Sequence, residues 1–156
     1  MIQRAQSIFL LLSAMLLTAF LFVNIWQGTD VANKQTVTLS SFFLENKIGE
    51  TVSTSYTFPL AILAILSVII SCTSIFSFNN RLKQMKFGMI NSVVIAGILG
   101  LTIYYMKDGQ ALLSKNATGE TNFGMFLPTA AVICNMIANR FIKKDDDLVR
   151  SADRIR

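Results

Sequence analysis

Four long intervals without a charged residue constrain this chain more than any other feature. They contain 25, 30, 20 and 19 residues, so all 23 charged side chains fall in the remaining 62 of 156 positions. A helix needs about 20 apolar residues to cross a bilayer, and a charge at its centre costs roughly 2.5–3.5 kcal/mol. The intervals therefore predict four transmembrane helices, and they exclude a soluble globular enzyme, a disordered chain and a disulfide-rich secreted domain. They lie between Arg4 and Asp30, Glu50 and Arg81, Lys86 and Lys107, and Glu120 and Arg140.

The expected fold is an all-α membrane protein, a four-transmembrane-helix bundle made by one domain over residues 1–156. The outer loops are predicted at residues 27–57 and 107–122, and a cytoplasmic tail follows the last helix over residues 143–156. Trp26 is expected at the outer membrane interface, where tryptophan is enriched. The predicted spans are approximately 7–26, 58–78, 87–106 and 123–142.

The first outer loop carries two segments of alternating β-branched residues. These segments, 35–39 and 51–56, are separated by the turn-like sequence 45–49. Alternation of this kind predicts short strands, so we expect a small β-hairpin outside the membrane. The apolar residues 42–44 are expected to pack on the membrane surface or on a partner.

Positive charge predicts the orientation of the helices. Ten Lys and Arg residues fall on the side of the two termini and four on the other side. The positive-inside rule therefore places both termini in the cytoplasm. The tail has an apolar face that includes Leu148 and Val149, and it is expected either to lie on the inner leaflet or a partner, or to be a frayed solvated segment. The predicted cytoplasmic anchor residues are Arg81, Lys83, Lys86, Arg140, Lys143, Lys144, Arg150 and Arg154.

Small and polar residues recur every four positions within the predicted spans. Gly88, Ser92, Ala96 and Gly100 form a stripe that we call the small-residue stripe, and a shallow surface of this kind lets another backbone approach closely. Asn91 and Asn135 lie at similar depth on the antiparallel third and fourth spans and are expected to hydrogen-bond between helices, while Asn139, four residues after Asn135, is expected at a helix-packing or partner contact. Ser67, Ser71 and Ser74 mark a similar face on the second span. A transport path is the alternative interpretation, but no ionisable residue lies between the span ends.

The chain contains no histidine and only two cysteines, Cys72 and Cys134, both inside predicted spans. The absence of histidine removes the commonest general base and the commonest metal ligand. We expect both thiols to be unpaired packing residues. The sequence therefore predicts no enzymatic activity, no cofactor, no metal and no nucleic-acid partner; the net charge of +5 is explained by the basic cytoplasmic side.

Three segments carry a resemblance to a known family. They are the opening residues 1–4, the basic loop 81–84, and the closing region from Phe126 to Arg156, of which residues 148–154 are the most specific. The chain resembles an uncharacterised family of small four-span inner-membrane proteins of Bacteroidota-type bacteria, catalogued as a domain of unknown function. The resemblance implies a bacterial inner membrane location and no established activity.

Three functions are open to such a chain. The favoured hypothesis is a non-catalytic accessory subunit of a larger inner-membrane complex in envelope biogenesis or protein translocation, with lipid and other integral membrane proteins as partners. The alternative is a small transporter or channel that works as a homo-oligomer. A lipid-acting enzyme would need Asp30, Glu45, Glu50 or Asp108, and no spacing between these carboxylates recommends them.

Overall fold

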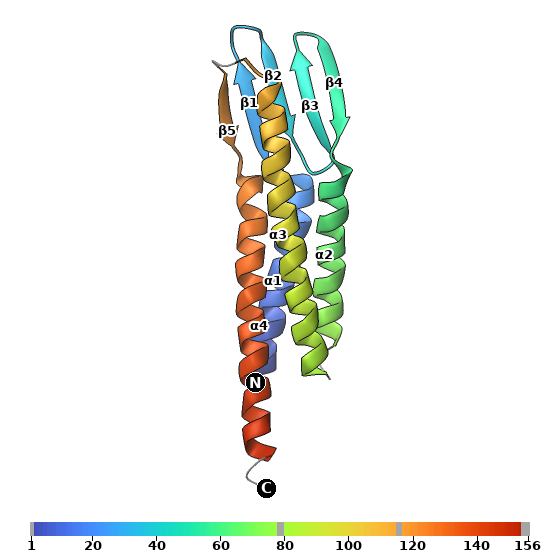
Figure 1. Ribbon diagram of the computed structural model, residues 1–156, viewed down its shortest axis with the longest axis vertical. Coiled ribbons are helices and arrows are strands. Elements are labelled where there is room, and N and C mark those ends of the chain that lie inside the picture. The colour runs from blue at the N-terminus through green and yellow to red at the C-terminus, as the bar shows by residue number, and fades with distance from the viewer. Residues whose placement is uncertain (1, 78–79, 115–116, 154–156) are drawn as a thin grey trace.

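A computed structural model describes residues 2–77, 80–114 and 117–153. Figure 1 shows a long bundle of helices that lie side by side, with a β-sheet at one end and both chain termini toward the other. The helices are α1 (Ile2–Phe22), α2 (Phe58–Phe76), α3 (Arg81–Ala111) and α4 (Phe126–Asp153), with a 3-10 turn, η1 (Phe123–Met125), before α4. The strands are β1 (Trp26–Asp30), β2 (Gln35–Leu39), β3 (Phe43–Ile48), β4 (Thr51–Tyr56) and β5 (Thr118–Thr121).

The five strands form one antiparallel sheet in the order β4-β3-β2-β1-β5. Four of them come from the segment between α1 and α2, and β5 comes from the segment between α3 and α4. Trp26 of β1 is paired with Leu39 on one side and with Thr121 on the other. The tight turn between β3 and β4 uses Gly49 at a φ of 57°, a conformation that glycine adopts without a steric penalty.

The expectation of an all-α fold with a small hairpin is wrong. The segments 35–39 and 51–56 do form strands, but they do not pair with each other, because β3 lies between them and includes the residues expected to turn. The sheet is larger than a hairpin because β1 pairs with β5 and so joins the segment between α1 and α2 to the segment between α3 and α4. Alternate residues of β1 and β2 are buried, so these strands form a packed layer.

The expectation of four transmembrane helices is also wrong as stated. Three helices are long and apolar enough to cross a membrane among the residues described, in the ranges Phe58–Phe76, Arg81–Ala111 and Phe123–Val149. The first apolar stretch behaves differently: α1 ends at Phe22, and its described apolar part, Gln6–Phe22, is shorter than a span. The last apolar residues of the predicted first span, including Ile25 and Trp26, are buried against the sheet.

The C-terminal end of α4 corrects a further expectation. No break separates a membrane helix from an amphipathic tail, because α4 continues to Asp153 as one helix. Residues 143–153 contain neither proline nor glycine, so nothing in the sequence interrupts the backbone hydrogen bonds there. In Figure 1 this end of α4 projects beyond the other helices.

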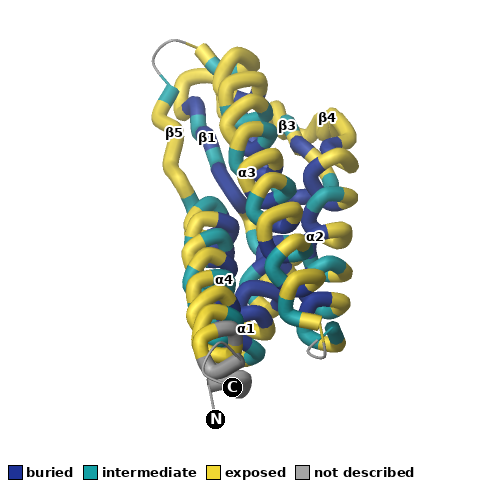
Figure 2. Tube along the Cα trace, turned by 60° about the horizontal axis from the view of Figure 1, so that its bottom comes forward, coloured by how far each residue is buried: buried dark blue, intermediate teal, exposed yellow. Residues whose placement is uncertain are grey.

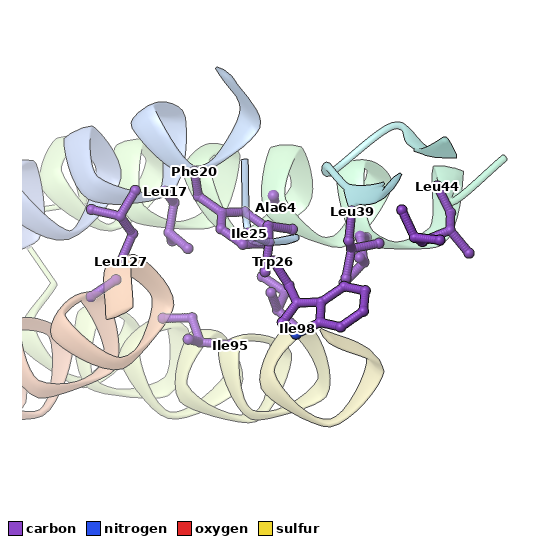
Figure 3. Close-up of a cluster of buried hydrophobic side chains, with 13 residues drawn as sticks. Leu17, Phe20, Ile25, Trp26, Leu39, Leu44, Ala64, Ile95, Ile98 and Leu127 are labelled. Carbon is purple, nitrogen blue, oxygen red and sulfur yellow. The ribbon is translucent and has the colours of Figure 1, made fainter. Parts of the chain in front are cut away.

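The hydrophobic core is continuous from the helices into the sheet. Figure 3 shows Trp26 between side chains of the bundle and side chains of the sheet. Its indole occupies a space lined by glycines: a Cβ atom at Gly28, Gly109 or Gly119 would lie within about 3 Å of the Trp26 ring. Gly28 and Gly119 are cross-strand neighbours, and Gly109 lies near the end of α3. Trp26 is therefore a core residue that joins α3 to the sheet, not the interfacial residue that we expected.

Candidate functional site

The helix bundle contains a cluster of buried polar side chains contributed by α2, α3 and α4. Ser67 and Ser71 are one turn apart on α2, so both face α3. Asn91 of α3 and Asn135 of α4 lie opposite them, and none of these four side chains is more than 1% exposed. In such surroundings an amide without a hydrogen-bond partner is costly, so the contacts of these groups decide the role of the cluster.

Asn91 is the centre of the cluster. Ser67 Oγ donates a hydrogen bond to Asn91 Oδ1 at 2.5 Å. Asn91 Nδ2 donates to Ser71 Oγ at 2.9 Å and to Asn135 Oδ1 at 3.3 Å. A single amide thus connects three helices, and its donors and acceptor are used within the protein.

Asn135 extends these contacts to the backbone of α3. Its Nδ2 atom donates to the carbonyl oxygen of Gly88 and to Ser92 Oγ, both at 2.8 Å. Ser92 Oγ donates in turn to the Gly88 carbonyl at 3.1 Å. Asn139 packs directly over Gly88, where any Cβ atom would overlap its amide group. Glycine at position 88 therefore allows α4 to approach the backbone of α3.

Two buried polar atoms near this cluster, Ser74 Oγ and Asn139 Oδ1, have no hydrogen-bond partner among the residues that the structure describes. The first helix is attached separately: Ser13 Oγ donates to the carbonyl of Ala131 at 3.0 Å, and the rings of Phe9 and Phe141 stack at 5.7 Å. Cys72 and Cys134 are half-buried free thiols. The cluster and these contacts hold all four helices together.

The small-residue stripe does not keep to one side of α3. Gly88 is buried and Ser92 half-buried against α4, whereas Ala96 and Gly100 are exposed. A Cβ atom added at Gly100 would meet nothing within 4 Å. The cause is helix geometry, because a step of four residues advances about 40° around the axis and three steps advance about 120°. The stripe is therefore divided between an internal half and a free outer half.

The predicted anchor residues gather at the end of the bundle opposite the sheet. Arg81 forms an ion pair with Asp145, Nε to Oδ2 at 3.3 Å, and also donates to the Asp145 carbonyl oxygen at 3.0 Å. Asp145 lies inside α4, so this ion pair connects α4 to the start of α3. Arg150 lies on α4, and Arg154 lies outside the described residues. The exposed basic residues are Lys83, Lys86, Arg140, Lys143 and Lys144.

A second polar site, which sequence reasoning missed, surrounds Asp30 at the end of β1. Its carboxylate accepts hydrogen bonds from the backbone of Ala32 (3.0 Å) and Asn33 (3.4 Å), from the Asn33 side chain (2.9 Å), and from Ser114 Oγ (2.5 Å). The Ser114 hydrogen bond is the main cause that lowers the pKa of Asp30, and the Asn33 and Ala32 bonds add to it, while burial acts in the opposite direction. Asp30 therefore ties the β1–β2 turn to the segment after α3. The Asp at a turn was visible in the sequence, but its partner 84 residues away was not.

The lowered pKa of Asp30 predicts a specific pH dependence of stability. Because this carboxyl titrates at a lower pH in the folded protein than its ordinary value of 3.8, its stabilising contribution is present above about pH 4 and is lost as the pH falls through the folded-state pKa. We expect Asp30→Asn to lower stability at pH 7 and to flatten the stability profile below pH 4. Unfolding midpoints of both proteins in detergent between pH 2 and 7 measure this; parallel profiles would contradict it.

The chemistry available to the described residues is limited by these contacts. They include no group of three or more His, Cys, Asp or Glu side chains placed to hold a metal ion. The buried amides bond to hydroxyls, amides and backbone of neighbouring helices, and the Asp30 carboxylate is used in a turn. These polar groups hold helices and strands together.

Fold and site together define a bundle of apolar, membrane-type helices that carries an antiparallel sheet at one end. Residues 2–155 match the model of a family described as a domain of unknown function, DUF4293, and the chain belongs to that family. No curated protein matches the chain.

Proposed function

We propose that the protein is a non-catalytic accessory subunit of a larger complex in the bacterial inner membrane, with a role in envelope biogenesis or protein translocation. In this proposal the three long apolar helices cross the bilayer, α1 packs beside them along α4 so that both ends of the chain lie on the cytoplasmic side, and the sheet lies outside the membrane. The exposed basic residues at the end remote from the sheet support this orientation.

The outer surfaces of the helices support a location in lipid. Figure 2 shows that exposed residues follow the outward side of each helix, while buried residues face the other helices. Large apolar side chains occupy these outward positions, and a soluble protein rarely exposes so continuous an apolar surface. Examples are Ile8 (62% exposed), Ile62 (62%), Val93 (73%) and Ile133 (52%).

The observation that carries the proposal is the division of the small-residue stripe. Its inner half, Gly88 and Ser92, is used to bind α4, so the bundle needs no further contact there. Its outer half, Ala96 and Gly100, leaves a shallow exposed surface on α3. In a membrane, helices associate through close van der Waals contact at such small residues. The outer half of the stripe is thus suited to a helix of another subunit.

The polar cluster supports a structural role over a transport path. Asn91 and Asn135 donate to and accept from protein groups on three helices, so they are engaged without a substrate. A homo-oligomeric transporter remains the competing function, and it predicts a defined homo-oligomer with solute flux in liposomes.

A matched pair of substitutions in the stripe tests the proposal. Gly100→Leu adds a side chain in open space, so we expect normal accumulation but loss of co-purifying subunits in mild detergent. Gly88→Leu forces Asn139 and α4 away from α3, and we expect it to destabilise the protein by about 1–3 kcal/mol, as overpacking does. Protein level, unfolding midpoint and co-purified proteins are the measurements.

The control is Ala19→Leu, which enlarges an exposed small residue on α1, away from the stripe. We expect this variant to retain both stability and partners. Retention of all partners by Gly100→Leu would show that the outer half of the stripe is not a docking surface.

A further inference from the structure

The edge strand β4 presents unpaired backbone groups along its whole length. It pairs with β3 alone in the part of the chain that the structure describes, and all six of its residues are exposed. The Thr57 amide donates to the Phe42 carbonyl, and this bond sets which residues of β4 face β3. Because backbone direction alternates along a strand, the N–H and C=O groups of Val52, Thr54 and Tyr56 point away from the sheet.

Nothing in β4 prevents another strand from pairing with it. Natural edge strands are protected by charge, proline, bulges, shortness or a covering element. The strand β4 contains no charge or proline, and its register with β3 runs without a bulge from 51 to 56. The opposite edge, β5, has only four residues and carries Glu120. The two edges of the sheet therefore differ, and β4 is the one open to pairing.

We propose that the β4 edge binds an extended segment of a different membrane protein, which adds a sixth strand to the sheet. The proposal deepens the proposed function, on which it rests for the location of the sheet outside the membrane. The partner's backbone would bond to Val52, Thr54 and Tyr56, the mode of recognition known as β-augmentation. Six residues correspond to a contact about 20 Å long.

The orientation of the sheet argues against a second copy of this chain as the occupant. Figure 1 shows the strands nearly parallel to the helices, so in a membrane they run along its normal. Two copies share one orientation in the membrane, so the two-fold axis of a symmetric dimer also follows the normal. Their β4 strands would then be parallel, with the same outward-facing residues at the same height. In a parallel pair, each residue bonds to residues that are offset from it along the other strand. The two-fold axis would instead place the same outward-facing residues directly opposite each other, so two copies cannot form these bonds.

The direction of β4 indicates the kind of segment that fits. The strand runs toward the membrane, because Tyr56 is followed at once by Thr57 and α2. An antiparallel partner, the more stable arrangement, therefore runs away from the membrane, as does a segment that directly follows the outer end of a membrane helix. Within this chain, β1 follows the apolar helix α1 in the same direction. Opposite Val52, Thr54 and Tyr56, uncharged β-branched or aromatic residues would pair best.

Site-specific photo-crosslinking in native membranes tests the inference. A benzophenone amino acid replaces Val52 on the edge strand or, as a control, Val31 in the β1–β2 turn; the two side chains are 58% and 89% exposed. We expect one discrete adduct from position 52, at least tenfold more abundant than from position 31. Its linked peptide should come from another protein, directly after a membrane helix. No adduct, equal adducts from both positions, or an adduct of two copies of this chain would overturn the proposal.

A second variant tests whether the backbone of β4 makes the contact. Thr54→Pro removes an outward N–H group without touching a bond to β3, whereas Thr54→Ala keeps that group. We expect the proline variant to lose the position-52 adduct at least tenfold, at unchanged protein level, and the alanine variant to keep it. An adduct that survives Thr54→Pro would overturn the proposal. Co-purifying subunits without the adduct would leave the proposed function standing and refute this inference alone.

Discussion

Replacement of Trp26 with alanine is expected to destabilise the protein by about 3–5 kcal/mol, the usual cost of removing a large buried aromatic side chain. Trp26 is 4% exposed, and its ring fills the space left by Gly28, Gly109 and Gly119. The sheet and α3 lie on either side of this space, and their regular backbones cannot collapse into the cavity that alanine would leave. The loss should fall on the contact between α3 and the sheet.

Chemical unfolding in detergent, followed by circular dichroism, measures this effect. The matched control is Val52→Ala on the exposed strand β4, for which we expect a change within about 0.5 kcal/mol. Trp26 is the only tryptophan, so its fluorescence reports on the same junction in the unsubstituted protein. A loss below about 1 kcal/mol for Trp26→Ala would show that the indole is not a core residue.

Replacement of Asn91 with alanine is expected to cost about 2–3 kcal/mol. The change removes the hydrogen bonds to Ser67, Ser71 and Asn135, and buried polar groups left without partners cost about 1–3 kcal/mol each in water-soluble proteins. Hydrogen bonds between membrane helices average about 0.6 kcal/mol each. The loss of three such bonds therefore corresponds to about 2 kcal/mol, the lower end of the expected cost. The unfolding midpoint of the variant in detergent measures the loss.

The double substitution of Asn91 and Asn135 tests whether the two side chains contribute to stability jointly or independently. The two side chains share a hydrogen bond, so the double variant should lose less stability than the sum of the single variants. Strict additivity would mean that the 3.3 Å contact contributes nothing. Met136→Ala, on the exposed face of α4, provides a control that should be nearly neutral.

Apolar runs and alternation predicted much of the architecture from local sequence. The runs after Phe58, Lys86 and Phe123 correspond to α2, α3 and α4, and the alternation in 35–39 and 51–56 corresponds to β2 and β4. These signals are local, because the period of apolar residues follows directly from helix and strand geometry.

The sheet as a whole could not be predicted in the same way. Strand β1 begins inside an apolar run, so Ile25 and Trp26 could not be distinguished from the end of a membrane helix by hydrophobicity. Strand β5 has four exposed residues and no apolar alternation, and its pairing with β1 joins residues about 90 positions apart. Strand β3 contains Glu45, Asn46 and Lys47, which favour turns or solvent. All three strands depend on tertiary contacts.

The candidate site was likewise predictable from the sequence only in part. The four-residue spacing identified Gly88 and Ser92, and the antiparallel arrangement of the third and fourth spans suggested that Asn91 and Asn135 lie at similar depth. The rotation of the stripe that exposes Gly100, the ion pair of Arg81 with Asp145, and the bond of Ser114 to Asp30 all require the relative positions of helices. Spacing along one helix does not contain that information.

Native mass spectrometry of the full chain, extracted from its own membranes in a mild detergent, tests the central claim most directly. If the protein is an accessory subunit, the spectrum will show it in a reproducible complex with at least one different membrane protein, and Gly100→Leu will shift it toward the free 17.3 kDa chain. A spectrum that contains only the monomer, or only a homo-oligomer, would contradict the account.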